Sequence, residues 1–562
     1  MKAMLLPLVP ADIEDEKDKN PQTAVTGAAV YTSTVLKALI ECGSYDHYFV
    51  VRRSDPVTSP KSENSLPRVS FTSVDAMPRF SASDQVVLFA AQPAMHVLSP
   101  WRIGLEIPRA PITGIIHSMH SRLFYVLLMR LLITGDMQSY DALICSSHAG
   151  KTVVENALGK ISEQLEQMSR VKLNFAPRLP VVPLGVWSKQ FDSTNREEAR
   201  RLCGFREKEI VFLYVGRFAE LDKADFAPLI LSFCLTVAPR CPGARLVLAG
   251  DDTVFSLTPG LRNLIAGLPN GERVNIEPNI SSGAKLNLFA AADVFVSPSD
   301  NIQETFGITL IEAMAARLPV LASDWNGYRD IVMPGITGFL IPTYMNPAAT
   351  DPASLLDTMF SFPGQIAAKT AVDMDQWARH AIELAENADL RQRMGEQGRQ
   401  RVHQEYDWPV VIRKYEQLWD GLLEESNRVR RNSPSSCRLP FDEMSLESAF
   451  AHYHSGNLGD QNIRLNKRMS PVLSNAEVRS RLLQPAKVFD ETIFAAILSE
   501  VAKLESVNAE EFSAILARDL KLPLSQARSH VARLAKFGFL EFVPNENKNA
   551  ELFEFDPMVE SA

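Results

Sequence analysis

The chain has 562 residues, a hydrophobic fraction of 46% and a formal net charge of −9. This length predicts several folded domains, and the negative charge argues against a broad nucleic-acid-binding surface. The cysteines show no paired or metal-type spacing; they are Cys42, Cys145, Cys203, Cys234, Cys241 and Cys437. We therefore expect reduced thiols in a cytoplasmic protein. We also expect no secretion signal and no membrane-spanning helix.

The amino-terminal third has the pattern of a parallel α/β domain. An apolar run at residues 4–9 predicts a first strand, and Gly27 opens a helical pattern that continues to Ile40. Residues 111–116 form another buried strand, which delivers His117 at its carboxyl end. Ligands of such domains lie at the carboxyl ends of the strands, so His117 is a candidate site residue.

The stretch 123–133 is almost wholly apolar but shorter than a membrane span. It predicts a core helix, and at most peripheral contact with a membrane. Strands at 141–147 and 181–186 follow, and we place the boundary of this first domain at residues 1–190.

A second α/β domain is expected over residues 191–345. Its first strand, 211–215, runs into Gly216 and Arg217, and Lys223 follows six residues after the arginine. A guanidinium fork and a mobile ammonium suit the oxygens of a departing diphosphate. The next strand ends in Gly250, and we interpret the following Asp251 and Asp252 as loop acids, because no third metal ligand stands near them in the sequence.

The most informative segment is 304–317, where one carboxylate precedes an apolar helical run and a second lies inside it. Glu312 is surrounded by apolar residues and should be buried with its helix, which is costly unless a partner hydrogen-bonds the carboxylate. A ligand hydroxyl is a suitable partner. Gly307 permits a close backbone approach, and the free N–H groups of Ile308 and Thr309 at the helix start suit an anion.

Strands at 319–323 and 335–341 complete the second domain. Residues 346–425 then form the segment of C-terminal helices, with a helical pattern from about 374 to 425. Residues 426–485 contain a linker and an unassigned segment. The pattern over 486–548 is three helices and a strand, which resembles a winged helix. The slightly acidic balance of this module argues against a nucleic-acid partner, so we expect it to bind a protein partner or to form a homodimer. If the module did bind DNA, Arg528, Arg533 and Lys536 would be the candidates to contact the groove.

The pair Glu304 and Glu312, framing Phe306 and Gly307, resembles the signature of the retaining nucleotide-sugar glycosyltransferases of family 4. The resemblance covers roughly the first 425 residues and implies the GT-B fold, with two Rossmann-like domains facing a cleft and a last helix crossing back to the first domain. Two positions depart from the family pattern. Ala224 follows Lys223 where the family usually has Gly, and Gly27 stands alone where most members carry two glycines.

The resemblance also implies roles for the site residues. Arg217 and Lys223 would hold the donor diphosphate, together with Gly27 and the segment formed by Phe306, Gly307, Ile308 and Thr309. Glu312 would bind ribose hydroxyls, and Glu304 and His117 would lie beside the donor sugar. The implied reaction moves a sugar from a nucleoside-diphosphate donor to a saccharide, lipid-linked or small-molecule acceptor with retention, with no metal or further cofactor.

Two alternatives stay open from the sequence. Sugar phosphorylases share this fold, so phosphate is a possible acceptor. The chain could also be a nucleotide-sugar-sensing regulator or scaffold that acts through residues 486–548. The intact charged residues at Arg217, Lys223, Glu304 and Glu312 disfavour that reading.

Overall fold

The computed structural model describes residues 1–7, 27–51, 68–72, 77–345 without 82, 118, 121, 135, 171, 221 and 222, 366–429, 458–469, and 491–543 without 537. The chain divides into two compact units. The first comprises residues 1–53 and 64–441, and the second comprises 54–63 and 442–562. Each unit is described by itself.

The first unit begins with a parallel sheet of six strands in the order β3-β2-β1-β4-β5-β6. Its strands are β1 (Lys2–Pro7), β2 (His47–Val51), β3 (Val69–Thr72), β4 (Gln85–Ala90), β5 (Ile112–Ile115) and β6 (Ala142–Ile144). The helices in this part are α1 (Gly27–Cys42), α2 (Ser99–Gly104), α3 (Arg122–Ile133) and α4 (His148–Ser169). The strands predicted at 111–116 and 141–147 are confirmed, and the strand predicted at 4–9 is confirmed as far as Pro7, because residues 8 and 9 lie outside the described residues. The strand predicted at 181–186 is wrong, because Val181 and Val186 form only isolated bridges, with Cys145 and Asp407.

A second six-stranded parallel sheet follows, in the order β12-β11-β10-β7-β8-β9. Its strands are β7 (Ile210–Val215), β8 (Ala244–Gly250), β9 (Val274–Pro278), β10 (Val294–Ser297), β11 (Val320–Ser323) and β12 (Gly338–Ile341). Its helices are α5 (Arg196–Leu202), α6 (Phe226–Ser232), α7 (Ala238–Arg240), α8 (Thr258–Ala266), α9 (Ser282–Ala291), α10 (Ile308–Ala315) and α11 (Tyr328–Ile331). The two sheets confirm the expected pair of Rossmann-like α/β domains.

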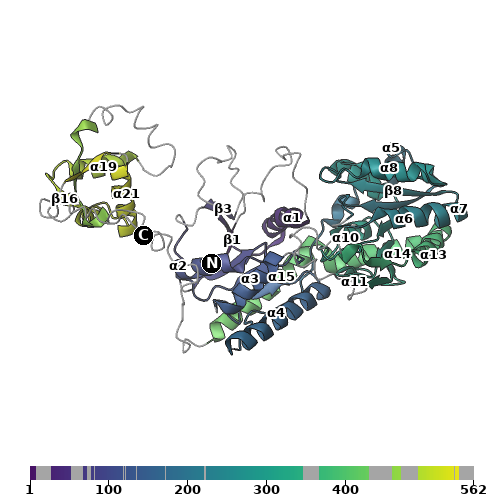
Figure 1. The fold of residues 1–562 in the computed structure, drawn as a ribbon, viewed down its shortest axis with the longest axis horizontal. Coiled ribbons are helices and arrows are strands. Elements are labelled where there is room, and N and C mark those ends of the chain that lie inside the picture. The colour runs from purple at the N-terminus through teal and green to yellow at the C-terminus, as the bar shows by residue number, and fades with distance from the viewer. Residues whose placement is uncertain are drawn as a thin grey trace, which may run out of the picture. The chain divides into compact units, whose positions relative to one another are not determined.

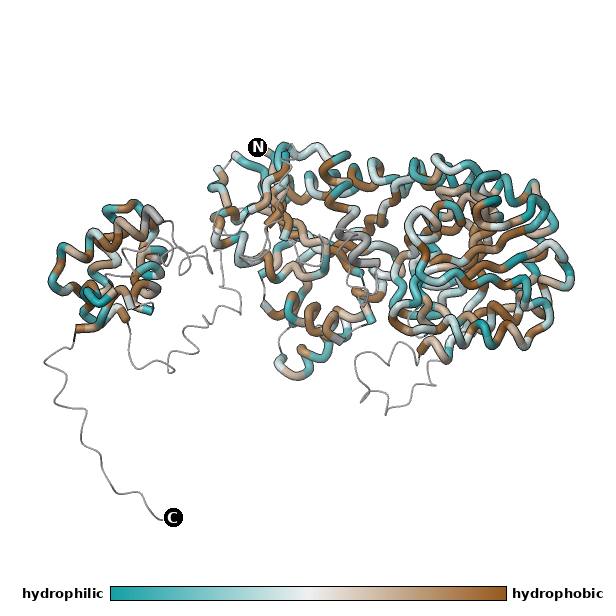
Figure 2. The backbone as a smooth tube through the Cα atoms, turned by 90° about the horizontal axis from the view of Figure 1, so that it is seen from above, coloured by the Kyte–Doolittle hydropathy of each residue, from teal (hydrophilic) through white to brown (hydrophobic). Residues whose placement is uncertain are grey.

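The strands of the second sheet are buried because their side chains are apolar on both faces. Figure 2 shows them as brown segments inside the teal and white outer helices. One face packs under α10 in a core that contains Phe295 and Ile311. The other face packs with Phe212 and Trp377 in a separate core.

Three helices end the first unit after a short antiparallel pair, β13 (Thr343–Met345) and β14 (Thr370–Val372). They are α13 (Met374–Glu386), α14 (Ala388–Arg401) and α15 (Trp408–Arg428). Figure 1 shows α13 and α14 with the second sheet, whereas α15 lies with the first. The indole N–H of Trp419 on α15 donates to Thr113 Oγ1 of β5 at 3.1 Å, so the last helix returns to the first domain as predicted.

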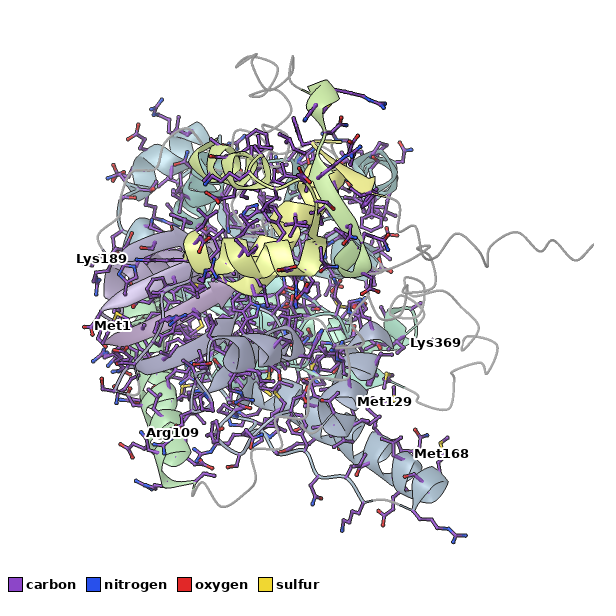
Figure 3. The ribbon with its side chains drawn as sticks, turned by 90° about the vertical axis from the view of Figure 1, so that its left-hand side faces the viewer. Met1, Arg109, Met129, Met168, Lys189 and Lys369 are labelled. Atoms are coloured by element: carbon purple, nitrogen blue, oxygen red, sulfur yellow. The ribbon has the colours of Figure 1, made fainter. Side chains whose placement is uncertain are left out.

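Helix α3 is only half a core helix. On one side of this helix Phe124 and Leu128 are buried, whereas Leu123 and Val126 of the same helix are 67% and 53% exposed. Figure 3 labels Met129 of α3 and Met168 of α4, which stand at the outside of the ribbon. Within the part of the chain that the structure describes, no helix is long and apolar enough to cross a membrane.

The second unit contains α19 (Glu491–Val501), α20 (Ala509–Asp519) and α21 (Leu524–Lys536), with β15 (Asn462–Leu465), β16 (Val507–Asn508) and β17 (Leu540–Val543). The strands form an antiparallel sheet in the order β16-β15-β17. The central strand β15 precedes all three helices, in the segment that the sequence left unassigned. Arg528 on α21 forms an ion pair with Glu510 on α20, so this cation is already engaged within the unit.

Candidate functional site

The predicted site residues of the second sheet gather where β7 and β10 end. Helix α10 begins at Ile308, and Gly307 precedes it with φ of 111°. A Cβ atom at Gly307 would lie 2.6 Å from the Tyr328 ring, so both the backbone angle and the available space require glycine. Helix α10 thus begins directly after the residue that packs against the Tyr328 ring. Its first N–H groups follow Glu304 by only a few residues in the chain.

Glu304 and Lys223 form an ion pair at this edge of the sheet. The Lys223 Nζ atom lies 2.9 Å from Glu304 Oε2, and the two side chains are 24% and 17% exposed. Burial raises the pKa of Glu304, but the Lys223 ammonium and the backbone N–H groups of Thr305 and Phe306 outweigh it, so the net pKa lies below its ordinary value. Glu304 is therefore an ionised acceptor with a fixed orientation.

Glu312 is buried in α10 as the sequence predicted, with 8% of its surface exposed. Its Oε1 atom accepts from Lys285 Nζ at 2.7 Å. Its Oε2 atom is buried and has no hydrogen-bond partner in the described structure. A buried acceptor oxygen in this state is costly until a donor reaches it, so the atom is available to a ligand hydroxyl.

Lys285 was missed by the sequence analysis. It is the one cation of α9, Ser-Gly-Ala-Lys-Leu-Asn-Leu-Phe-Ala-Ala, whose other side chains are small, polar or apolar. That isolated charge was the available signal, but the approach of α9 to α10 depends on tertiary packing.

Arg217 extends the cationic character of the site. Its Nη2 atom lies 3.5 Å from Gln303 Oε1, next to the Glu304 loop. Among the described residues, Arg217 has no carboxylate in ion-pair distance. Its guanidinium thus lies near Gln303, the residue before Glu304, with hydrogen-bonding capacity left for an anion.

Two further predicted site residues, Phe306 and Gly27, carry no charged side chain into the site. The Phe306 side chain is 1% exposed and packs against Tyr406 with ring centroids 6.0 Å apart. A ligand could therefore meet Phe306 only through its backbone. Gly27 is the first residue of α1.

His117 stands directly beyond the end of β5. Its Nε2 atom lies 2.6 Å from the carbonyl oxygen of Ala91. Burial lowers the pKa of His117, and the hydrogen bond to Ala91 opposes this effect only in part. The imidazole is accordingly a neutral group that donates to Ala91.

Two contacts from the start of α4 reach the loops of the second sheet. Ser147 Oγ donates to the carbonyl oxygen of Thr305 at 2.7 Å, and the N–H of His148 donates to Asp330 Oδ2 at 2.7 Å. The sequence analysis did not predict either contact. The first contact attaches the segment after β6 to the residue that follows Glu304, and the second attaches it to α11.

The acids after β8 act within their own loop. Asp252 accepts from the N–H groups of Leu257 and Thr258 at 2.7 and 2.9 Å, and Asp251 accepts from Thr253. No group of three or more His, Cys, Asp or Glu side chains suited to a metal occurs among the described residues.

The known proteins that this chain resembles are described as glycosyltransferases. Residues 195–353, which contain Arg217, Lys223, Glu304 and Glu312, match the model described as glycosyl transferases group 1. The chain is 30% identical over 181 residues to a D-inositol 3-phosphate glycosyltransferase of Mycobacterium marinum, covering 32% of this chain and 37% of that protein. It is 27% identical over 330 residues to D-inositol 3-phosphate glycosyltransferase 1 of Catenulispora acidiphila, covering 57% and 75%.

A solved structure, the sucrose-phosphate synthase of Thermosynechococcus elongatus, aligns with a TM-score of 0.48 and 18% identity over 76% of this chain and all of that one. The match to the Mycobacterium marinum relative spans little more than a third of its length. Residues 195–353 of this chain are thus similar to the glycosyl transferases of group 1.

Proposed function

We propose that this protein is a glycosyltransferase that moves a sugar from a nucleoside-diphosphate donor to an acceptor with retention of the anomeric configuration. The observation that carries the proposal is the buried Glu312 Oε2, which lacks a hydrogen-bond partner in the described structure. It lies in the helix that begins beside the Glu304–Lys223 pair. A ligand with hydroxyl groups and a diphosphate satisfies both parts of this site.

Each charged residue has a role in that proposal. Lys223, Arg217 and the N–H groups at the start of α10 would stabilise the charge that grows on the departing diphosphate. Glu312 would accept hydrogen bonds from the ribose hydroxyls, held in place by Lys285. Glu304 would accept from the donor sugar while its other contact keeps Lys223 near the phosphate.

Retention is proposed to occur on one face of the sugar. The bond between the anomeric carbon and the diphosphate oxygen breaks through an oxocarbenium-like state, and the acceptor oxygen forms its bond on the same face. The acceptor proton passes to the leaving phosphate oxygen. No enzyme-bound glycosyl intermediate and no side-chain base are needed. The neutral His117, which donates to Ala91, would lie beside the sugar.

The acceptor in this proposal is a saccharide, a lipid-linked molecule or a small molecule. The proposed location of the enzyme is the cytoplasm. The second unit is proposed to bind a protein partner or a second copy of the chain. Its Arg528 is paired with Glu510, which leaves less free positive charge for a nucleic acid.

The proposal is tested by release of nucleoside diphosphate from UDP-, GDP-, ADP- and dTDP-sugars in the presence of saccharide, lipid-linked and small-molecule acceptors, with and without inorganic phosphate. One nucleotide family should be turned over, and Glu304→Gln should lower the rate by about 100-fold or more. Glu272→Gln, at a carboxylate that is 72% exposed, is the matched control and should keep the rate. Stimulation by phosphate would identify a phosphorylase, and the anomeric configuration of the product, read by proton NMR, tests retention. No turnover of any donor would contradict the proposal.

A further inference from the structure

The start of α4, in the first domain, is bonded to two segments of the second domain. Ser147 Oγ donates to the carbonyl oxygen of Thr305 at 2.7 Å, and the backbone N–H of His148 donates to Asp330 Oδ2 at 2.7 Å. These two hydrogen bonds form the α4 link. Thr305 directly follows Glu304, and Asp330 lies in α11. The proposed reaction uses Glu304 but neither of these bonds.

Ser147 is held in one orientation at its end of the α4 link. Its side chain is fully buried. The Oγ atom also accepts from the N–H of Gly150 at 3.0 Å, so Ser147 caps the first turn of α4. A hydroxyl has a single hydrogen to donate, and the Thr305 carbonyl receives it. The same hydroxyl thus fixes the start of a helix on one side and the backbone of the Glu304 loop on the other.

The two segments that receive the α4 link pack closely against each other. A Cβ atom at Gly327, directly before α11, would lie 2.4 Å from the Thr305 carbonyl oxygen. The Asp330 carbonyl oxygen accepts from Arg401 Nη2 at 2.8 Å and from the Tyr406 hydroxyl at 2.9 Å. Backbone packed this closely has little room to adjust. The α4 link therefore connects the first domain to a rigid part of the second.

The first-domain end of the link lies next to His117. His117 and Ser147 follow β5 and β6, which pair in parallel with Ile115 beside Ile144. Both residues therefore stand beyond the carboxyl ends of neighbouring strands, where ligands of such sheets lie. The α4 link joins this end of the first sheet to the residue after Glu304.

The groups proposed to hold the donor have their own partners inside the second domain. Lys223 pairs with Glu304 at 2.9 Å, and Lys285 pairs with Glu312 at 2.7 Å. Because these contacts do not involve α4, donor affinity should survive when the α4 link is broken. Sugar transfer has a stricter requirement, since a displacement of the reacting groups by about 1 Å can slow a reaction about 100-fold.

We propose that Ser147 is a positioning residue for sugar transfer, which holds Glu304 through the α4 link at the distance from the first domain that the reaction requires. Asp330 supports the same link from α11. This inference rests on the proposed function, because it concerns the donor site assigned there. It predicts a loss of rate without a loss of donor affinity.

The test compares kcat with donor affinity in the full chain. The donor is whichever of UDP-, GDP-, ADP- and dTDP-glucose binds the native protein most tightly by calorimetry. The acceptor is the saccharide, lipid-linked molecule, small molecule or inorganic phosphate that the native protein turns over fastest. Ser147→Ala should lower kcat by about 10- to 100-fold and change the dissociation constant of the donor by less than about twofold.

Ser162→Ala is the matched control on the same helix. It removes a serine hydroxyl that also donates to a backbone carbonyl, that of Leu173 at 2.8 Å, but this bond lies within the first domain. The variant should keep both kcat and donor affinity.

Further variants separate the α4 link from the cap of the helix. Ser147→Gly lacks the hydroxyl but begins a helix almost as well as serine, so it should show the same loss of kcat. Asp330→Ala removes the acceptor of the His148 N–H and should lower kcat by about three- to tenfold. Asp330→Asn keeps an oxygen in that place and should restore most of the rate. These variants decide the question if Ser147→Ala fails to fold.

A native kcat in Ser147→Ala and Ser147→Gly would overturn the inference and leave the proposed function standing. An equal loss of kcat in Ser162→Ala would do the same, because the effect would then belong to α4 as a whole. A loss of donor affinity as large as the loss of kcat would also overturn it, because Ser147 would then support donor binding rather than transfer. Absence of turnover by the native protein with every donor and acceptor would overturn both.

Discussion

The Lys223 ammonium lies 2.9 Å from the Glu304 carboxylate, and this ion pair joins the loops that follow β7 and β10. Each partner is attached to further structure: Lys223 through its carbonyl to Ser299, and Glu304 through the next residue, Thr305, to Ser147. The pair therefore places one cation and one anion at a defined spot before any ligand arrives. Preorganisation of this kind is what makes a charged site effective in catalysis.

Lys223→Met should weaken nucleotide-sugar binding by about 10- to 100-fold, because the diphosphate loses a cation. It should also lower the free energy of unfolding by about 1–2 kcal/mol, since Glu304 is left ionised without its partner. Urea unfolding and calorimetry measure the two effects. Lys189→Met, at an exposed lysine labelled in Figure 3, is the control and should change neither.

The double variant Lys223→Met with Glu304→Gln separates the two effects. Removing both charges should restore most of the lost stability but none of the binding. If the double variant is as unstable as the sum of the single ones, the two residues do not interact as the structure shows.

Gly307→Ala should prevent donor binding. It should also lower the free energy of unfolding by more than the cost of placing alanine at a positive φ angle. Alanine at positive φ costs about 1–2 kcal/mol, and here the added Cβ would also lie 2.6 Å from the Tyr328 ring. Gly335→Ala is the matched control, because Gly335 has φ of 75° but nothing within 4 Å of an added Cβ. Equal losses of unfolding free energy in the two variants would contradict the close contact at Gly307.

Trp419 should be a main determinant of how α15 binds to the first sheet. It is fully buried, so Trp419→Ala should cost about 3–5 kcal/mol of unfolding free energy. Thr113→Val keeps the shape but leaves the indole N–H without its partner, and should cost about 1–2 kcal/mol. Thr152→Val on the exposed side of α4 should be close to neutral, and a similar loss there would argue against the Trp419–Thr113 bond.

His117 should make stability depend on pH below neutrality. Because burial lowers the pKa of folded His117, the unfolded chain binds a proton below about pH 6.5 that the folded chain does not bind. The free energy of unfolding should therefore fall between about pH 6.5 and about pH 5, and His117→Asn should reduce this slope. His148→Asn, at a side chain that is 78% exposed, is the control. Identical slopes in the native protein and His117→Asn would contradict the buried neutral imidazole.

The sequence predicted the elements whose pattern is local. The apolar run 211–215 ending at Gly216, and the helix beginning at Ile308 around Glu312, both follow from patterning and from glycine chemistry, and the structure places them as predicted. Burial of Glu312 was also predictable, because its sequence neighbours are apolar on every side.

Contacts between distant segments were not predictable in the same way. Lys285 lies on another helix from Glu312, and the bond from Ser147 to Thr305 joins residues 158 positions apart. The same limit explains β15, a short strand whose pairing with β16 and β17 is set by packing in the second unit rather than by its own pattern. The exposed apolar side of α3 was missed because composition alone does not show which face is covered.

The central claim is that Glu312 completes a site for the nucleoside part of a nucleotide sugar. The most direct test is thermal unfolding of the native protein, Glu312→Ala and the control Glu272→Ala with saturating UDP, GDP, ADP, dTDP and their sugar conjugates. Ligand that binds only the folded state raises the midpoint of unfolding. We predict that one nucleotide family stabilises the native protein and Glu272→Ala, and that this stabilisation is lost in Glu312→Ala. A native protein that responds to none of them, or a Glu312→Ala variant that responds as the native protein does, would contradict the claim.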